Sequence, residues 1–136
     1  MRGSLVDASP PAGFRAAFDW NAWVGLPYAT VGNCWEFLRP VLRAGLGAEL
    51  PPFLDDVLGL RAEAEHLPGW QRIPVQEAQP FDVLVFTLSP NRPPHVGVVI
   101  RPGLFLHCLK DKPSSVDSYH RAFWRERVEE VYHYHP

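Results

Sequence analysis

The chain has 136 residues, of which 46% are hydrophobic and 21% charged, and a formal net charge of −2 at pH 7. This length and composition predict one globular domain with a hydrophobic core and exclude a disordered chain. The near-neutral charge, without a basic block, argues against binding nucleic acid through its phosphates. No apolar run in the sequence is long enough to cross a bilayer.

The N-terminal segment differs from the rest of the chain. Residues 1–7 lack the apolar stretch of a cleaved signal peptide, so the sequence predicts synthesis in the cytoplasm. Any work outside the cytoplasm would need another route of delivery. We expect residues 1–13, which are rich in proline and glycine, to form a loose arm. Residues 14–136 then form a single domain.

Helical patterns come first in the chain. Apolar spacing predicts a short helix over residues 14–23, a helix over 34–44 and a further helix over 53–65. Pro40 should kink or shorten the second of these helices, and Gly45 and Gly47 should end it.

Strand patterns dominate the second half. We expect strands over residues 70–75, 81–86, 95–100, 104–108 and 128–134, and a short helix over 115–125. A three-residue turn, 101–103, should join the third and fourth of these strands. The sequence therefore predicts an α+β fold, with N-terminal helices packed on a central antiparallel sheet of about five strands.

Cys34 is predicted to begin the helix over residues 34–44. Asn33 is a favourable N-cap, and Glu36 is placed to complete a capping box. The free N–H groups and the dipole at a helix N-terminus stabilise a thiolate, which is the nucleophilic form of cysteine. The alternative is that Cys34 is a small buried hydrophobic residue.

Two histidines of the predicted hairpin could serve that cysteine. With a turn at residues 101–103, His95, Gly97 and His107 share one face, and the two histidines are diagonal neighbours about 7–8 Å apart at the backbone. Gly97 would leave room between the rings. His95 would then act as the base and His107 would hold its tautomer. Alternatively, both are ordinary hydrogen-bonded residues, or they bind zinc together with Cys34.

The remaining candidates have weaker signals. The Tyr28 phenol could donate a hydrogen bond to an oxyanion beside the Cys34 N–H, or it could be a wall residue, and we weigh the two equally. Cys108 should point away from His107 and be structural. The other histidines are expected at the surface: His66, His120, His133 and His135.

With these residues in place, the chain resembles the NlpC-type peptidases, papain-like cysteine hydrolases of bacterial cell walls. The resemblance is greatest to the compact branch found in phage tail-assembly and cell-wall hydrolase proteins. It rests on short matching segments in the family's order: residues 23–28, 33–35, 46–51, 79–86, 95–99, 105–107 and 119–128.

The resemblance implies a papain-like fold in which Cys34 is the nucleophile, His95 the base and His107 the third polar residue. It implies oxyanion or substrate binding by Tyr28 and Trp35. We expect no metal or other cofactor, because Cys34 is placed where a helix dipole activates a nucleophile. The implied substrate is the peptide stem of peptidoglycan, cut at the bond between γ-linked D-glutamate and a diamino acid. Delivery to the cell wall or periplasm, or within a phage-like particle, would follow.

The sequence departs from the family's pattern at several positions. Asn33 stands where aspartate is usual, and Trp35 where serine is common. Glu36 replaces a glycine, and a carboxylate near Cys34 opposes thiolate formation. Phe81 replaces the glycine that usually precedes the strand aspartate.

Two alternatives keep the resemblance but change the function. One is a structural or assembly component of a phage-like tail that has the same fold and little activity. The other is a thiol acyltransferase, since residues 33–37 also resemble the motif of lecithin:retinol acyltransferase-like enzymes. In those circularly permuted relatives the histidine precedes the cysteine, whereas here Cys34 precedes His95, which favours the peptidase.

Overall fold

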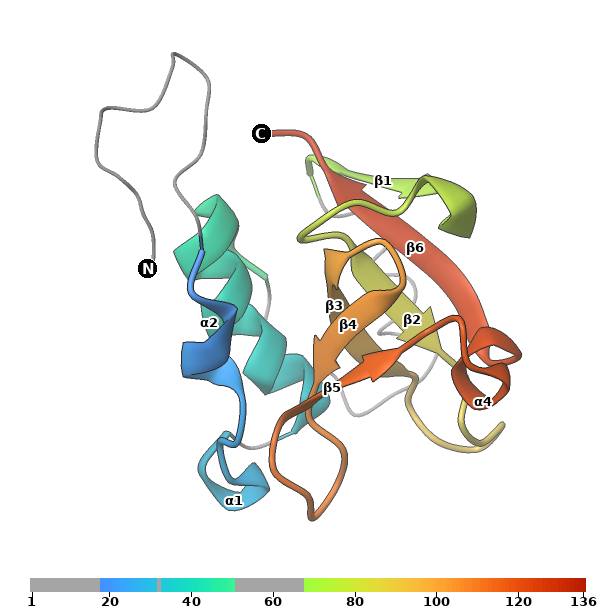
Figure 1. Ribbon diagram of the computed structural model, residues 1–136. Coiled ribbons are helices and arrows are strands. Elements are labelled where there is room, and N and C mark those ends of the chain that lie inside the picture. Colours follow the sequence, from blue (N-terminus) through green and yellow to red (C-terminus); the bar gives the residue numbers. More distant parts are fainter. Residues whose placement is uncertain (1–17, 32, 51–67) are drawn as a thin grey trace.

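The computed structural model describes residues 18–31, 33–50 and 68–136 (Figure 1). The predicted arm over residues 1–13 and the predicted helix over 53–65 lie outside the described residues. In chain order the elements are η1 (Trp20–Trp23), α1 (Tyr28–Val31), α2 (Cys34–Leu46), β1 (Trp70–Ile73), η2 (Val75–Glu77), β2 (Val83–Phe86), β3 (His95–Arg101), β4 (Leu104–His107), β5 (Ser115–Ser118), α4 (Ala122–Arg125) and β6 (Val128–Tyr134). The elements η1, α1 and α2 precede all the strands, which agrees with the predicted α+β class, while η2 and α4 lie between strands.

The helix α2 begins at Cys34, as predicted. The side-chain oxygen of Asn33 caps it by accepting a hydrogen bond from the Glu36 N–H at 2.8 Å. The helix passes through Pro40 and ends at Leu46, with Gly47 in the left-handed conformation (φ 68°) as its C-cap. The predicted end at residue 44 was therefore two residues too early, and Gly45 is a buried helical residue rather than a stop.

The strands form one antiparallel sheet. Among the described residues it has six strands in the order β1-β6-β2-β3-β4-β5, one more than predicted. The extra strand is β5, which lies within the segment 115–125 that was predicted to be helical. That prediction was wrong because residues 115–118 pair their backbones with β4, and only Ala122–Arg125 forms a helical turn.

The hairpin of β3 and β4 differs from the prediction at its turn and agrees with it further along. Arg101 pairs with Leu104, so the turn is only Pro102-Gly103, and Gly103 takes a positive φ of 96°. A bulge at Ile100 restores the predicted register, because Val99 pairs with Phe105 and Val98 with Leu106.

Each face of the sheet packs against its own hydrophobic cluster. The helix α2 stands along β3 on one face, and α4 lies at the other side of the sheet (Figure 1). The α2-side cluster includes Val83, Val85, Val96, Val98, Leu106 and Cys108 from the strands. The α4-side cluster includes Leu84, Phe86, Val99, Phe105 and Trp124. Alternate residues of each strand therefore serve opposite faces.

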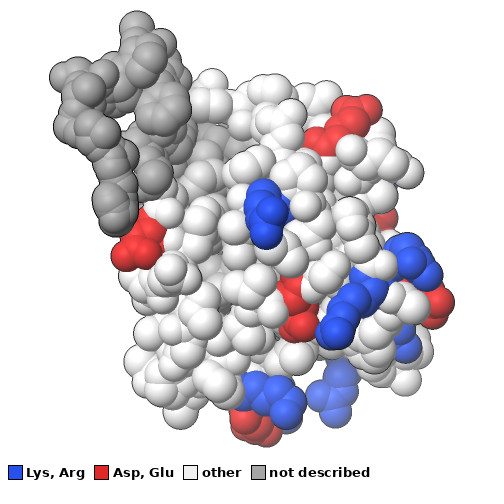
Figure 2. Space-filling view, viewed as in Figure 1, with Lys and Arg blue, Asp and Glu red and all other residues white. Residues whose placement is uncertain are grey.

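The surface in Figure 2 carries acidic and basic side chains interspersed among uncharged residues. This distribution agrees with the net charge and differs from the continuous basic stripe of a nucleic-acid binder. Within the described ranges, the helices are all too short or too polar to cross a bilayer.

Candidate active site

The structure joins His95 and His107 directly. His95 begins β3 and His107 ends β4, and their side chains meet on the same face of the hairpin, as predicted. His95 Nε2 lies 2.8 Å from His107 Nδ1. The space beside Gly97 is not empty, since a Cβ there would lie 2.6 Å from the Phe105 ring. Gly97 therefore admits Phe105, whose ring packs against the His107 imidazole.

Asp117 completes this arrangement, although no sequence pattern pointed to it. His107 Nε2 lies 2.7 Å from a carboxylate oxygen of Asp117 on β5. The segment Ser115–Ser118 is polar and only partly buried, so it lacks the apolar alternation that marks a strand. The available signal was a second hairpin after residue 107. Pairing of β5 with β4 in that hairpin brings Asp117 next to His107.

Trp124 of α4 covers the histidine pair. Its ring centroid lies 5.7 Å from that of His95 and 5.0 Å from that of His107. This enclosure lowers the pKa of His95 to about 3, chiefly through burial and then through the charge of His107. Burial also lowers the pKa of His107, against the opposing hydrogen bond from Asp117. Both imidazoles are therefore neutral near pH 7.

Cys34 lies at the N-terminus of α2, next to the beginning of β3. It packs against the α2-side cluster and keeps a partly exposed surface at the helix N-terminus. Burial nevertheless raises its pKa, and backbone hydrogen bonds from Val96 and Trp35 only partly oppose this rise. Burial therefore shifts the pKa of Cys34 upward, whereas the helix N-terminus alone would lower it.

The start of β3 is common to Cys34 and the histidine pair. The Val96 backbone forms a hydrogen bond with Cys34, and Val96 directly follows His95 in the chain. Among the described residues, the hydrogen bonds of the His95 ring lead to His107, and none joins the ring to the Cys34 sulfur. Catalytic hydrogen bonds are often long in unliganded structures and tighten with substrate, so this geometry is compatible with a nucleophile and its base.

Tyr28 and Trp35 occupy different environments. The pKa of Tyr28 is raised by burial first and then by the neighbouring Cys34, which places the phenol in the electrostatic surroundings of the sulfur. Trp35 is 3% exposed and lies within the α2-side core. Its indole therefore packs beneath the site, while its backbone favours the thiolate of Cys34.

Ser114 fixes the segment that leads to Tyr28. Its hydroxyl donates to the Trp23 carbonyl at 2.6 Å and accepts from the Leu26 N–H at 2.9 Å. Its backbone N–H donates to the Leu26 carbonyl, and its carbonyl accepts a hydrogen bond from the Gly25 N–H. The loop before β5 and the loop before α1 are therefore held together at a buried serine.

The other predicted side chains lie apart from this group. Cys108 is buried in the α2-side cluster, pointing away from His107 as predicted, and His120 is exposed. His133 is not a free surface residue, because its Nδ1 lies 2.6 Å from the buried Asp82 carboxylate. His66 lies outside the described residues. In the part of the chain that the structure describes, no group of three or more histidine, cysteine, aspartate or glutamate side chains is arranged to hold a metal ion.

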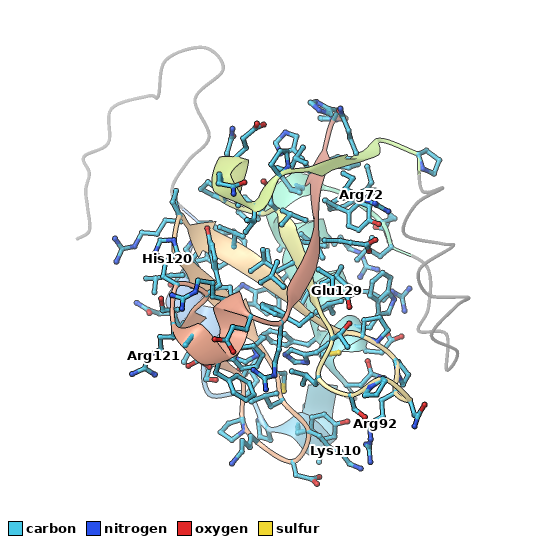
Figure 3. The ribbon with its side chains drawn as sticks, turned by 90° about the vertical axis from the view of Figure 1, so that its right-hand side faces the viewer. Arg72, Arg92, Lys110, His120, Arg121 and Glu129 are labelled. Atoms are coloured by element: carbon cyan, nitrogen blue, oxygen red, sulfur yellow. The ribbon has the colours of Figure 1, made fainter. Side chains whose placement is uncertain are left out.

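Two cationic side chains stand near this end of the sheet. Arg92 precedes β3 and Lys110 follows β4, and Figure 3 shows both at the same end of the molecule. Both residues are exposed. They border the loops that flank His95 and His107, where they could attract an anionic ligand.

A sequence model of the NlpC/P60 family matches residues 21–133 of the chain. This range contains the helix with Cys34 and the strands with His95, His107 and Asp117. A search of curated proteins finds no match.

Solved structures of the same family share the fold. An NlpC/P60 family protein from Bacillus cereus ATCC 10987 is 18% identical with a TM-score of 0.64, covering 85% of this chain and 38% of its own. The NlpC/P60 domain of the peptidoglycan hydrolase SagA is 21% identical with a TM-score of 0.59, and the match covers 82% of this chain and 89% of the SagA domain chain. An NLP/P60 family protein from Staphylococcus aureus subsp. aureus Mu50, described as similar to lipoprotein, is 19% identical with a TM-score of 0.62. That match covers 97% of this chain and 46% of the other. The chain thus spans less than half of two of these structures.

Proposed function

Because the chain belongs to the NlpC/P60 family of papain-like cysteine peptidases, we propose that it hydrolyses peptide bonds in bacterial peptidoglycan. The structure of SagA, a peptidoglycan hydrolase with this fold, supports the substrate class. The observation that carries the proposal is the 2.8 Å contact between His95 Nε2 and His107 Nδ1. The pair lies at the end of β3 where the Val96 backbone forms a hydrogen bond with Cys34.

The chemistry follows from these positions. His95 takes the proton from the Cys34 thiol as the sulfur attacks the scissile carbonyl carbon. The negative charge that develops on the carbonyl oxygen is stabilised by backbone N–H groups at the start of α2 and by the Tyr28 hydroxyl. The tetrahedral intermediate then breaks its C–N bond, and His95 returns the proton to the leaving amine. Water, deprotonated by His95, hydrolyses the resulting thioester.

The proposed bond is the one between γ-linked D-glutamate and a diamino acid in the stem peptide. Stem peptides carry free carboxylates, and the exposed Arg92 and Lys110 near the strand end would attract them. Delivery of the protein to the cell wall or periplasm, and assembly into a phage-like particle, remain proposals of the sequence alone.

The test compares the two cysteines of the chain. Purified muropeptides are digested with the wild-type protein, with Cys34→Ala and with Cys108→Ala, and the products are identified by mass spectrometry. Loss of cleavage in Cys34→Ala, with cleavage retained in a folded Cys108→Ala, supports the proposal. The mass of the products shows which bond is cut. Cleavage that survives in Cys34→Ala would overturn the assignment.

A further inference from the structure

The contacts of the site form a chain of three side chains. Asp117 Oδ2 lies 2.7 Å from His107 Nε2, and His107 Nδ1 lies 2.8 Å from His95 Nε2. His107 is fully buried and His95 is 6% exposed, so water has little access to their shared hydrogen bond. Each imidazole therefore depends on its protein neighbour for hydrogen bonding.

The carboxylate at one end fixes the direction of every bond in the chain. A carboxylate only accepts hydrogen bonds, and a neutral imidazole has one donor and one acceptor nitrogen. His107 must therefore donate from Nε2 to Asp117, which leaves its Nδ1 as an acceptor. His95 must then donate from Nε2 to that acceptor, which leaves the lone pair of the ring on Nδ1.

We propose that Asp117 is a positioning residue that acts through His107 to keep the Nδ1 atom of His95 unprotonated. This goes beyond the role of His107 alone, because either ring of a pair of neutral histidines can be the donor of their shared hydrogen bond. Without the carboxylate, the reversed chain would be equally well bonded and would place a proton on His95 Nδ1. The inference rests on the proposed function for the use that is made of that lone pair.

The proton transfer then needs only two groups of the site, the Cys34 thiol as donor and His95 Nδ1 as acceptor. The Cys34 S–H bond breaks, its proton bonds to the Nδ1 lone pair of His95, and the sulfur electron pair attacks the carbonyl carbon. The imidazolium that forms on His95 keeps its Nε2–H bond to His107. No proton moves along the chain, so Asp117 and His107 hold the ring while the transfer takes place at Nδ1.

The first test reads the tautomers directly. In long-range proton–nitrogen NMR spectra of the ¹⁵N-labelled full chain at neutral pH, we expect His95 Nδ1 and His107 Nδ1 to be pyridine-like. Both Nε2 atoms should be pyrrole-like. A protonated His95 Nδ1 in the wild-type protein would overturn the proposal without any variant.

The second test removes the acceptor. Asp117→Leu, which keeps the branching of the side chain but cannot accept a hydrogen bond, should place protons on His95 Nδ1 in at least part of the population. It should also lower kcat about tenfold to a hundredfold with KM unchanged, by analogy with the loss when a group that orients a metal-binding histidine is removed. Val116→Thr is the matched control, since Val116 is a 39% exposed neighbour on the same strand. Its tautomers and kcat should equal those of the wild type.

The two tests separate this inference from the proposed function. An Asp117→Leu protein with wild-type tautomers or wild-type kcat would contradict the positioning role, whatever the substrate. The expected tautomers in a protein that cleaves no muropeptide would support the positioning role and contradict the proposed substrate.

Discussion

The imidazoles of His95 and His107 share a buried hydrogen bond of 2.8 Å beneath the ring of Trp124. Two neutral imidazoles bond well in such an enclosure, because one donates and the other accepts. A proton added to either ring would place a charge in a site that water scarcely reaches. The pair is therefore a point at which the fold is sensitive to acid.

The first prediction concerns stability in acid. His95 titrates near pH 6.5 in an unfolded chain and has a pKa of about 3 in the fold, so the unfolded state binds more protons between these values. The free energy of unfolding should therefore fall as the pH drops from 6.5 toward 3, by up to about 1.4 kcal/mol per pH unit for this group. The lowered pKa of His107 acts in the same direction, and the raised pKa of Asp82 opposes it.

Urea denaturation at several pH values measures this dependence. His95→Gln should flatten it, while His120→Gln, at an exposed position, should leave it as in the wild type. The comparison is of the slope of the unfolding free energy against pH. A loss of stability in His95→Gln that is the same at every pH leaves this slope unchanged. Equal curves for wild type and His95→Gln would contradict the buried neutral imidazole.

The second prediction concerns the reactivity of Cys34. Burial raises its pKa above the ordinary value of a thiol, so the thiolate fraction at pH 7 is small. We expect alkylation by iodoacetamide to be slow at neutral pH and to accelerate only under alkaline conditions. Labelling rates are measured in Cys108→Ala, in which Cys34 is the remaining cysteine of the chain. Fast alkylation below pH 7 would show instead that a thiolate–imidazolium pair exists at rest.

The third prediction concerns Phe81 and Gly45. Phe81 has a φ of 74°, and a Cβ on Gly45 would lie 2.1 Å from its ring. Gly45→Ala should therefore lower the free energy of unfolding by about 1–3 kcal/mol through overpacking, despite the better helix propensity of alanine. In a Phe81→Ala background the same substitution should cost nothing. Urea denaturation of the four proteins gives the coupling energy, and additive effects would contradict the contact.

The fourth prediction concerns Ser114. Ser114→Ala leaves the Trp23 carbonyl and the Leu26 N–H without their side-chain partner and should cost about 1–3 kcal/mol of stability. It should also lower kcat, because the loosened segment carries Tyr28. Ser118→Ala, which loses only an exposed hydrogen bond, should change neither measurement appreciably. Thermal melts and steady-state kinetics distinguish the two variants, and equal behaviour would show that the Ser114 clamp has no role.

The sequence was informative wherever a residue pattern was strong and local. Asn33 identified the start of α2, and the alternation of β3 and β4 placed His95 and His107 on one face. The assumed turn had one residue too many, yet the bulge at Ile100 restored the register and preserved the result. Register near the site depends on the buried faces of the strands more than on the turn.

The contributions that escaped prediction depend on tertiary contacts. Asp117 lies on an edge strand whose short polar sequence matches no strand pattern, and only its pairing with β4 defines it. The pKa of Cys34 was expected to follow the helix dipole, but burial proved larger. Phe81, which stands where the family usually has glycine, keeps the backbone conformation that glycine favours and fills a space against Gly45.

The place of β6 bears on how the protein is made. This strand is the last in the described chain, yet it lies between β1 and β2 in the sheet. During synthesis the ribosome releases β1 to β5 first, and β2 must wait with one side unpaired until residues 128–134 emerge. An open strand edge of four consecutive buried apolar residues invites pairing with other nascent chains, so yield in cells should depend on how fast translation finishes.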